Sequence, residues 1–210
     1  MFDWNGTLLN DFSLHLRSLN AVLARFNIPL LSTSYAREIV MKSPEAMVAW
    51  FHTKGVPPSR TLKSIRALRD PVIEEYWNTV HLTRGAREML DYCKSQNMKI
   101  AIVSGARETH IARRLKELEI EHYFNQVVGN VWGKKTTAMK SVLKQFGINH
   151  SEAFYVDDTY DGIQAAHLAN VYSFGLTQNS YHSSYLIEDA DPTYVVESFA
   201  ELLEILKRGG

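Results

Sequence analysis

The chain has 210 residues, of which 45% are hydrophobic and 22% charged, and its 23 acidic residues balance its 23 basic residues. This length predicts one core domain with a modest insertion, and the balanced charge excludes the basic surface typical of nucleic-acid-binding proteins. No apolar run approaches the roughly 18 residues needed to span a bilayer, so we expect neither a nucleic acid nor a membrane as a partner.

The beginning of the chain bears on both location and the start of the sheet. Met1-Phe2-Asp3 has neither the basic nor the apolar region of a signal peptide, and the single Cys93 excludes an internal disulfide, so we expect a cytoplasmic protein. Only two residues precede Asp3, whereas a central strand normally has about five. Either the first strand is unusually short or the chain is truncated upstream.

Residues 11–83 have the pattern of successive helices without a strand. Apolar residues recur at helical spacing over 14–26, 46–51 and 72–80. Prolines are expected in the loops or at the helix starts of this region, at Pro29, Pro57, Pro58 and Pro71. The region is therefore predicted to be a helical insertion.

From residue 84 onward, short apolar strands alternate with amphipathic helices. The predicted strands are 99–103, 153–156, 171–174 and an edge strand at 194–196, and the predicted helices are 107–118, 136–146, 162–169 and 199–206. This alternation predicts an α/β fold with a Rossmann-like parallel-sheet core, formed by residues 1–10 and 84–210, and an all-helical cap at 11–83. Ligands of such sheets bind beyond the carboxyl ends of the strands.

Four polar segments fall at predicted strand ends or helix starts. They are Asp3 with Gly6-Thr7, Ser104-Gly105, Lys134-Lys135, and Asp157-Asp158 with Asp161. A hydroxyl and free N–H groups at a helix start can hold phosphate oxygens. Clustered carboxylates repel one another unless a cation neutralises them, and Mg²⁺ prefers such hard oxygen ligands. Together the segments predict a site for a small anion and a metal.

In order and position, these segments resemble the four motifs of the haloacid dehalogenase superfamily of phosphohydrolases. The first motif, usually Asp-x-Asp-Gly-Thr, corresponds to residues 3–7, and the second corresponds to Ser104. The third corresponds to Lys135 or Lys134, and the fourth to Asp157, Asp158 and Asp161. The predicted insertion follows the first motif directly, where the phosphoglycolate-phosphatase-like branch of the family carries its helical cap.

The resemblance implies a Mg²⁺-dependent phosphatase that cleaves a small phosphorylated metabolite through an aspartyl-phosphate, as a monomer or homodimer. Asp3 is the expected nucleophile, assisted by Ser104 and the motif lysine. The implied metal ligands are Asp3, the backbone carbonyl of Asn5, Asp157, Asp158 and Asp161. The implied substrate-binding residues are Trp4, Gly6, Thr7, Gly105, Arg107 and, in the cap, Lys42.

Asn5 is the main departure from the family pattern. Most family phosphatases have an aspartate there, which protonates the leaving group and then deprotonates water, whereas an amide cannot exchange a proton at neutral pH. Turnover is therefore expected to be slow unless another group, such as His110 or His182, takes this role.

The third and fourth motifs each leave a choice of residue. Asp158 is the preferred metal ligand of the fourth motif, although its separation from Asp161 is one residue shorter than usual, and Asp157 is a second ligand or an orienting partner. Lys135 is preferred to Lys134 because the helix then continues through the following residues.

Two other functions fit the same motifs. A metal-independent dehalogenase also uses an aspartyl nucleophile and tolerates Asn5. A non-catalytic member of the family would bind a phosphorylated metabolite or a partner without turnover. A receiver-type phosphoacceptor is disfavoured by the motif order and by the long insertion.

Overall fold

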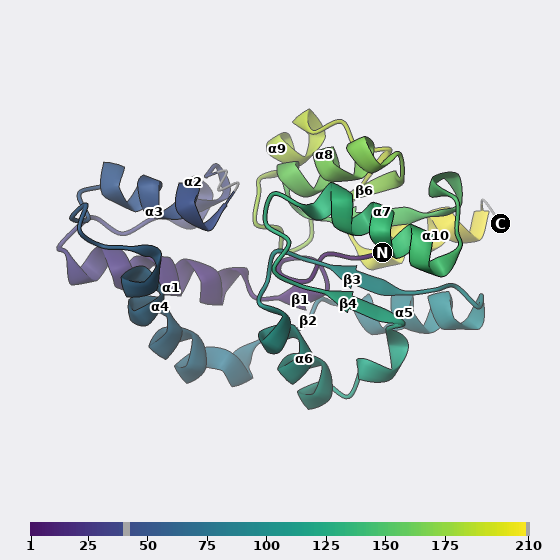
Figure 1. The fold of residues 1–210 in the computed structure, drawn as a ribbon, viewed down its shortest axis with the longest axis horizontal. Coiled ribbons are helices and arrows are strands. Elements are labelled where there is room, and N and C mark those ends of the chain that lie inside the picture. Colours follow the sequence, from purple (N-terminus) through teal and green to yellow (C-terminus); the bar gives the residue numbers. More distant parts are fainter. Residues whose placement is uncertain (40–42, 209–210) are drawn as a thin grey trace.

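The computed structural model describes residues 1–39 and 43–208, which form two adjacent lobes (Figure 1). The larger lobe contains the sheet, and the smaller lobe contains the helices between residues 12 and 76. The predicted α/β class with a helical cap is therefore confirmed. None of the described helices is long and apolar enough to cross a membrane.

In the described part of the chain, the larger lobe is built on one parallel sheet. Its strands are β3 (Ala101–Val103), β4 (Gln126–Val128), β5 (Phe154–Asp157), β6 (Tyr172–Leu176) and β7 (Tyr194–Val196). Phe2 joins β3 to β5, because it forms parallel bridges with both Ile102 and Val156. The spatial order is therefore β4, β3, residues 1–3, β5, β6, β7, and Asp3 ends the segment at the centre of the sheet.

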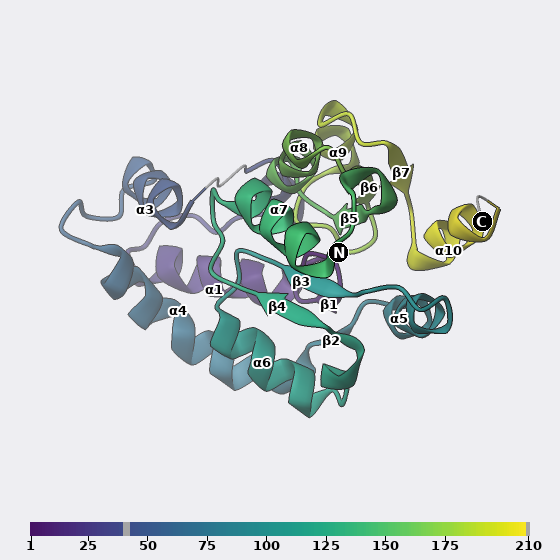
Figure 2. The ribbon, with the colours of Figure 1, turned by 45° about the vertical axis from the view of Figure 1, so that its right-hand side comes forward.

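Helices cover both faces of this sheet. They are α5 (Ala86–Ser95), α6 (Glu108–Glu117), α7 (Lys135–Phe146), α8 (Tyr160–Ala169), α9 (Ser184–Asp189) and α10 (Phe199–Arg208). Strand residues alternate between faces, so Ile102 packs into the core that includes α5, α6 and α10, while Ala101 and Val103 pack towards α7 and α8. Figure 2 shows β3 and β4 between α7 and α6.

The cap has a hydrophobic core of its own. Its helices are α1 (Phe12–Arg25), α2 (Thr33–Arg37), α3 (Pro44–Thr53) and α4 (Leu62–Tyr76), and a short 3₁₀ turn, η1 (Trp77–Thr79), follows α4. Buried side chains from α1, α3 and α4 meet in this core, including Leu23, Phe51 and Ile65. The antiparallel pair β1 (Leu9–Asn10) and β2 (His81–Leu82) lies where the chain leaves and re-enters the larger lobe.

Some elements differ from the expectations. Pro71 was expected in a loop or at a helix start, but it lies inside α4. Proline removes the hydrogen bond to the carbonyl four residues earlier, and here both Pro71 and Ala67 are exposed, so water can bond that carbonyl. The last cap helix was expected at 72–80, but α4 begins at Leu62 and ends at Tyr76, and η1 follows it. The elements α2, α5, β1, β2, β4 and α9, most of which are very short, were not predicted from the sequence.

Candidate active site

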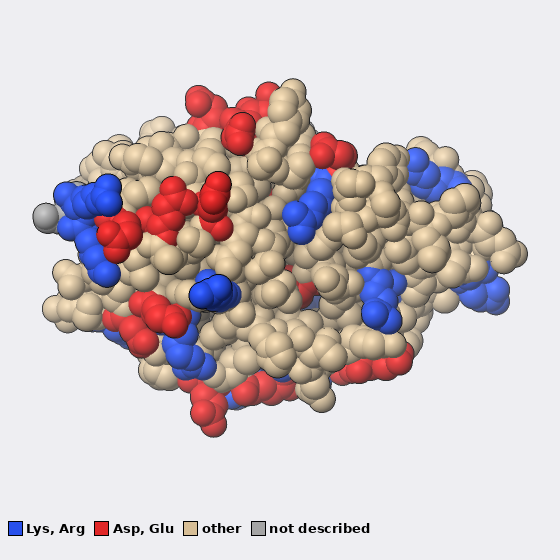
Figure 3. Space-filling model, turned by 180° about the vertical axis from the view of Figure 1, so that it is seen from behind, with Lys and Arg blue, Asp and Glu red and all other residues tan. Residues whose placement is uncertain are grey.

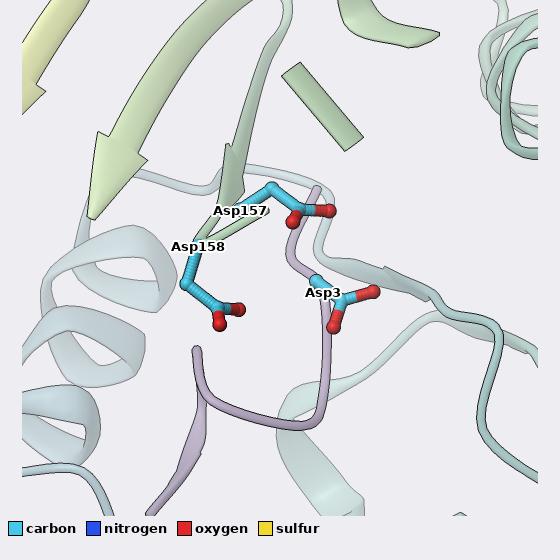
Figure 4. Close-up of side chains that lie close together, drawn as sticks. All are labelled: Asp3, Asp157 and Asp158. Carbon is cyan, nitrogen blue, oxygen red and sulfur yellow. The ribbon is translucent and has the colours of Figure 1, made fainter. Parts of the chain in front are cut away.

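Three buried carboxylates meet at the carboxyl end of the sheet (Figure 4). Asp3 ends the central segment, Asp157 is the last residue of β5, and Asp158 follows it. Ligand oxygens of the three residues all lie within 4.8 Å of one another. They converge because the first segment and β5 are parallel neighbours and therefore end at the same edge.

Short contacts from other segments fix each carboxylate. Lys135, the first residue of α7, places its Nζ 2.7 Å from Asp3 Oδ1 and 2.5 Å from Asp157 Oδ2. The backbone N–H and hydroxyl of Thr159 donate to Asp157 Oδ1 at 2.8 and 2.6 Å. Asp158 is held in the same way, as it accepts from the Thr7 hydroxyl and the Tyr181 N–H, both at 2.7 Å.

If all three carboxyls were ionised, their negative charge would exceed the positive charge of Lys135, the ammonium group that contacts them in the described part of the chain. Burial raises the pKa of Asp3 to about 6, against the opposing effect of Lys135. Burial, together with the charges of Asp157 and Asp3, raises the pKa of Asp158 well above its usual range. Burial also lowers the pKa of Lys135, but the two carboxylates it contacts outweigh this and raise it overall. Three hard oxygen donors with an unbalanced charge fit a divalent cation such as Mg²⁺.

Two glycines make room for these carboxylates. A Cβ on Gly6 would lie 2.2 Å from Asp158 Oδ2, and Gly6 also has a φ of +75°, which disfavours other residues. A Cβ on Gly162, in the first turn of α8, would lie 1.9 Å from Asp157 Oδ2. Any larger side chain at either position would displace a carboxylate of the cluster.

A cavity of about 550 Å³ lies between the larger lobe and the cap. Its floor includes Asp3, Ser104 and Lys135, and its walls include residues of α1 and α4. Figure 3 shows the surface of one face hollowed between the two lobes, with acidic and basic groups interspersed around it. A volume of this size suits a small ligand.

Ser104 and Gly105 lie where the sequence analysis expected an anion. Ser104 follows β3 and is buried, its Oγ accepts from Ala106 N–H at 3.2 Å, and its hydroxyl helps to lower the pKa of Asp3 against the effect of burial. A Cβ on Gly105 would lie 2.9 Å from the Trp132 indole nitrogen. Both Ser104 and Gly105 line the cavity.

The other residues expected at the site either support the three carboxylates or line the cavity. Gly6 N–H donates to the Leu9 carbonyl and to Asp11 at 2.9 and 3.0 Å, and Thr7 supports Asp158. Trp4 is buried yet contributes to the cavity lining. Asp161 also lines the cavity from the first turn of α8, outside the three-carboxylate cluster of the described residues.

The basic residues expected at the site also differ in where their side chains lie. The structure brings Lys135 to the carboxylates, whereas Lys134 is exposed. Arg107 lines the cavity, but its guanidinium pairs with Asp70 of α4 at 2.8 and 3.3 Å. Both of these side chains are more than a third exposed, so the pair contributes about 1 kcal/mol or less. Lys42 lies outside the described residues.

Asn5 has an acidic partner that the sequence analysis missed. Asn5 Nδ2 donates to Asp11 Oδ2, and the other Asp11 oxygen accepts from Gly6. Asp11 precedes α1 and has the sequence signal of a helix cap, but its side chain makes no capping bond and turns to Asn5. Burial raises the pKa of Asp11 to about 6. A buried carboxyl group therefore lies beside the amide that replaces the family's acid.

The two histidines considered as replacement acids have lowered pKa values. Burial lowers the pKa of His182 to about 4, and its Nδ1 accepts from Tyr160 N–H at 2.9 Å. Burial also lowers the pKa of His110, whose ring packs against Trp77 with centroids 5.6 Å apart. Both rings are therefore largely uncharged at neutral pH and are poor proton donors.

Mg²⁺ is expected to raise the thermal unfolding midpoint at pH 8, because a bound cation neutralises buried carboxylates that repel one another. Asp158→Asn should abolish this shift, since it removes a charged ligand from the cluster. Asp161→Asn is the matched control and should retain it. Differential scanning fluorimetry with and without Mg²⁺ measures both. Loss of the shift in Asp161→Asn, with retention in Asp158→Asn, would contradict this assignment.

Asn5→Asp should lower the free energy of unfolding at pH 8 by about 2–4 kcal/mol, because it places a half-buried carboxylate in contact with the buried carboxylate of Asp11. A carboxyl whose pKa is raised on folding contributes stability at low pH, which is lost as the pH rises through that pKa. The loss should therefore shrink below about pH 6, near the raised pKa of Asp11.

The double variant Asn5→Asp/Asp11→Asn restores an amide–carboxylate pair and should recover most of this stability. Urea denaturation at pH 8 and at pH 5.5 measures both effects. Simple additivity of the two single substitutions would contradict the contact.

Comparisons with known proteins agree with the motifs. A family model described as haloacid dehalogenase-like hydrolase matches residues 1–176. The phosphoglycolate phosphatases of Mannheimia succiniciproducens and Haemophilus influenzae are 26% and 27% identical to this chain, and each alignment covers 98% of this chain and 96% of the relative. The crystal structure of a hydrolase from Pseudomonas syringae superposes with a TM-score of 0.79 at 20% identity, over 99% of this chain and 96% of that chain. The chain belongs to the haloacid dehalogenase-like hydrolase family.

Proposed function

We propose that this hydrolase is a Mg²⁺-dependent phosphatase that cleaves a small phosphate monoester with Asp3 as its nucleophile. The observation that carries the proposal is the contact of Asp3 with Lys135 on the floor of the cavity, beside the buried Asp157 and Asp158. The names of the two bacterial relatives make 2-phosphoglycolate the first substrate to test.

The proposed reaction has two displacements at phosphorus. An Asp3 carboxylate oxygen attacks phosphorus, and the bond between phosphorus and the leaving oxygen breaks, which releases the leaving group as an anion that takes a proton from solvent to become the alcohol. Water then attacks the phosphorus of the aspartyl-phosphate, the bond to Asp3 breaks, and inorganic phosphate leaves. Each step requires negative groups to approach one another, so positive charge at the site lowers both barriers.

Different residues would orient the nucleophile, hold the phosphoryl oxygens and bind the metal. Lys135 orients Asp3 and offsets its charge, and Ser104 with the N–H groups of the following turn would hold the transferring oxygens. Asp3, Asp158 and the Asn5 carbonyl would hold the Mg²⁺, which supplies further positive charge to the phosphoryl oxygens. Asp157 is best suited to orient Lys135, because Lys135 and Thr159 already occupy its two oxygens.

Proton transfer is where this site departs from the family pattern. Asn5 can donate a hydrogen bond but cannot give up a proton to an alkoxide at neutral pH. A leaving group that is stable as an anion does not need that proton. The proposed enzyme should therefore cleave aryl phosphates better than alkyl phosphates.

Asp3→Asn should reduce the hydrolysis of p-nitrophenyl phosphate in the presence of Mg²⁺ by at least about 10³-fold, because an amide is not a nucleophile for phosphorus. Asp189→Asn, at the exposed end of α9, is the control and should keep the rate. Full activity in Asp3→Asn would exclude the mechanism. Metal-independent release of halide from a 2-haloacid would identify a dehalogenase instead, and binding without turnover would identify a non-catalytic member.

Restoring an acid at residue 5 should raise kcat most for substrates with poor leaving groups. Asn5→Asp/Asp11→Asn is expected to raise kcat for an alkyl phosphate by about 10²-fold, the usual size of a general-acid contribution, and to raise kcat for p-nitrophenyl phosphate much less. Steady-state kinetics on the two esters measures this difference. Equal gains on both would show that proton transfer to the leaving group does not limit the rate.

A further inference from the structure

Arg69, on the part of the cavity wall that the cap forms, is a cation whose hydrogen-bond partners are uncharged. Arg66 and Arg69 of α4 and Arg107 all line the cavity. Arg107 is balanced by Asp70 and Arg66 is exposed, whereas Arg69 is partly buried. No Asp or Glu within residues 1–39 and 43–208 forms an ion pair with Arg69.

The contacts of Arg69 fix its guanidinium without neutralising it. Its Nε and Nη2 donate to Ser18 Oγ at 3.1 and 3.0 Å, and Nη2 also lies 3.1 Å from His15 Nδ1. Its Nη1 meets Met47 Sδ at 2.9 Å, a weak acceptor. Burial and the charge of Arg69 hold the pKa of His15 well below its usual range, so this ring is an uncharged acceptor.

With these contacts, Arg69 keeps the charge and the N–H donors needed to bind an anion. Burial lowers the pKa of Arg69 to about 10, so it remains a cation at neutral pH. A guanidinium has five N–H donors, and among the described residues the acceptor that faces Nη1 of Arg69 is the Met47 thioether. Because Nε and Nη2 already contact Ser18 and His15, a carboxylate or phosphate would accept from Nη1, and its negative charge complements that of the guanidinium.

We propose that Arg69, positioned by Ser18 and His15, binds a second anionic group on the leaving-group part of the substrate. The inference rests on the proposed function, because it assumes that the phosphate occupies the floor of the same cavity. It restricts the substrate class to small phosphate esters whose alcohol carries a carboxylate or another phosphate. A purely structural role, in which Arg69 only ties α4 to α1, is the competing explanation.

Substrate selectivity separates these two roles. We would measure kcat/KM with Mg²⁺ for 2-phosphoglycolate, for 2-hydroxyethyl phosphate, in which a neutral hydroxymethyl group replaces the carboxylate, and for ethylene glycol bisphosphate. The wild-type protein should prefer at least one of the two esters that carry a second anionic group to 2-hydroxyethyl phosphate by about 10²-fold or more. The better of the two identifies the second anionic group.

The variants test whether Arg69 causes this preference. Arg69→Met keeps a long apolar stem without the charge and should reduce the preference at least about 10-fold, and Arg69→Lys should restore part of it. Arg113→Met removes a charge from an exposed arginine of α6, which is paired with Glu74 and Glu117, and should leave the preference unchanged. An unaltered preference in a folded Arg69→Met would overturn the proposal.

Absence of phosphatase activity can be distinguished from absence of an anion site at Arg69. If the wild-type protein hydrolysed none of these esters and did not hydrolyse p-nitrophenyl phosphate, calorimetry on the same protein would still compare the binding of 2-phosphoglycolate with that of 2-hydroxyethyl phosphate. Tighter binding of the acid that is lost in Arg69→Met would support the Arg69 site without catalysis. Equal binding of both esters would reject it.

Discussion

The structure depends on the charge balance of three buried carboxylates at one edge of the sheet. Asp3, Asp157 and Asp158 have ligand oxygens within 4.8 Å of one another, and the Lys135 ammonium group contacts Asp3 and Asp157. Burying like charges is costly unless hydrogen bonds and cations compensate. This constraint explains why hydroxyl and N–H donors surround the cluster and why glycines stand at positions 6 and 162.

Local patterns were sufficient to predict most of the larger lobe and the carboxylate cluster. The parallel strands and the family were confirmed, because apolar strands ending in polar residues reveal which side chains share an edge of the sheet. The contacts of Asn5 with Asp11 and of Arg69 with Ser18 could not be predicted in this way. Asp11 has the sequence signal of a helix cap and Arg69 that of a solvated helix residue, and only tertiary packing gives them other roles. Pro71 was misplaced because exposure, which makes it tolerable within α4, is not visible in the sequence.

Two features distinguish this site within its family pattern. The pairing of Asn5 with Asp11 keeps a carboxyl group next to the amide that occupies the usual position of the acid. Arg69 places a positive charge on the cap wall of the same cavity. A substrate that joins a phosphate to a second anion would connect the two lobes through one molecule, which would couple its recognition to the packing of the cap.

The central claim, that Asp3 becomes phosphorylated, can be tested by trapping. Because Asn5 cannot act as the base for the attacking water, the aspartyl-phosphate should accumulate during turnover of p-nitrophenyl phosphate. Acid quenching, borohydride reduction and peptide mass spectrometry would then reveal homoserine at position 3. Phosphate release without any modification of Asp3, or with the label on another residue, would contradict the account.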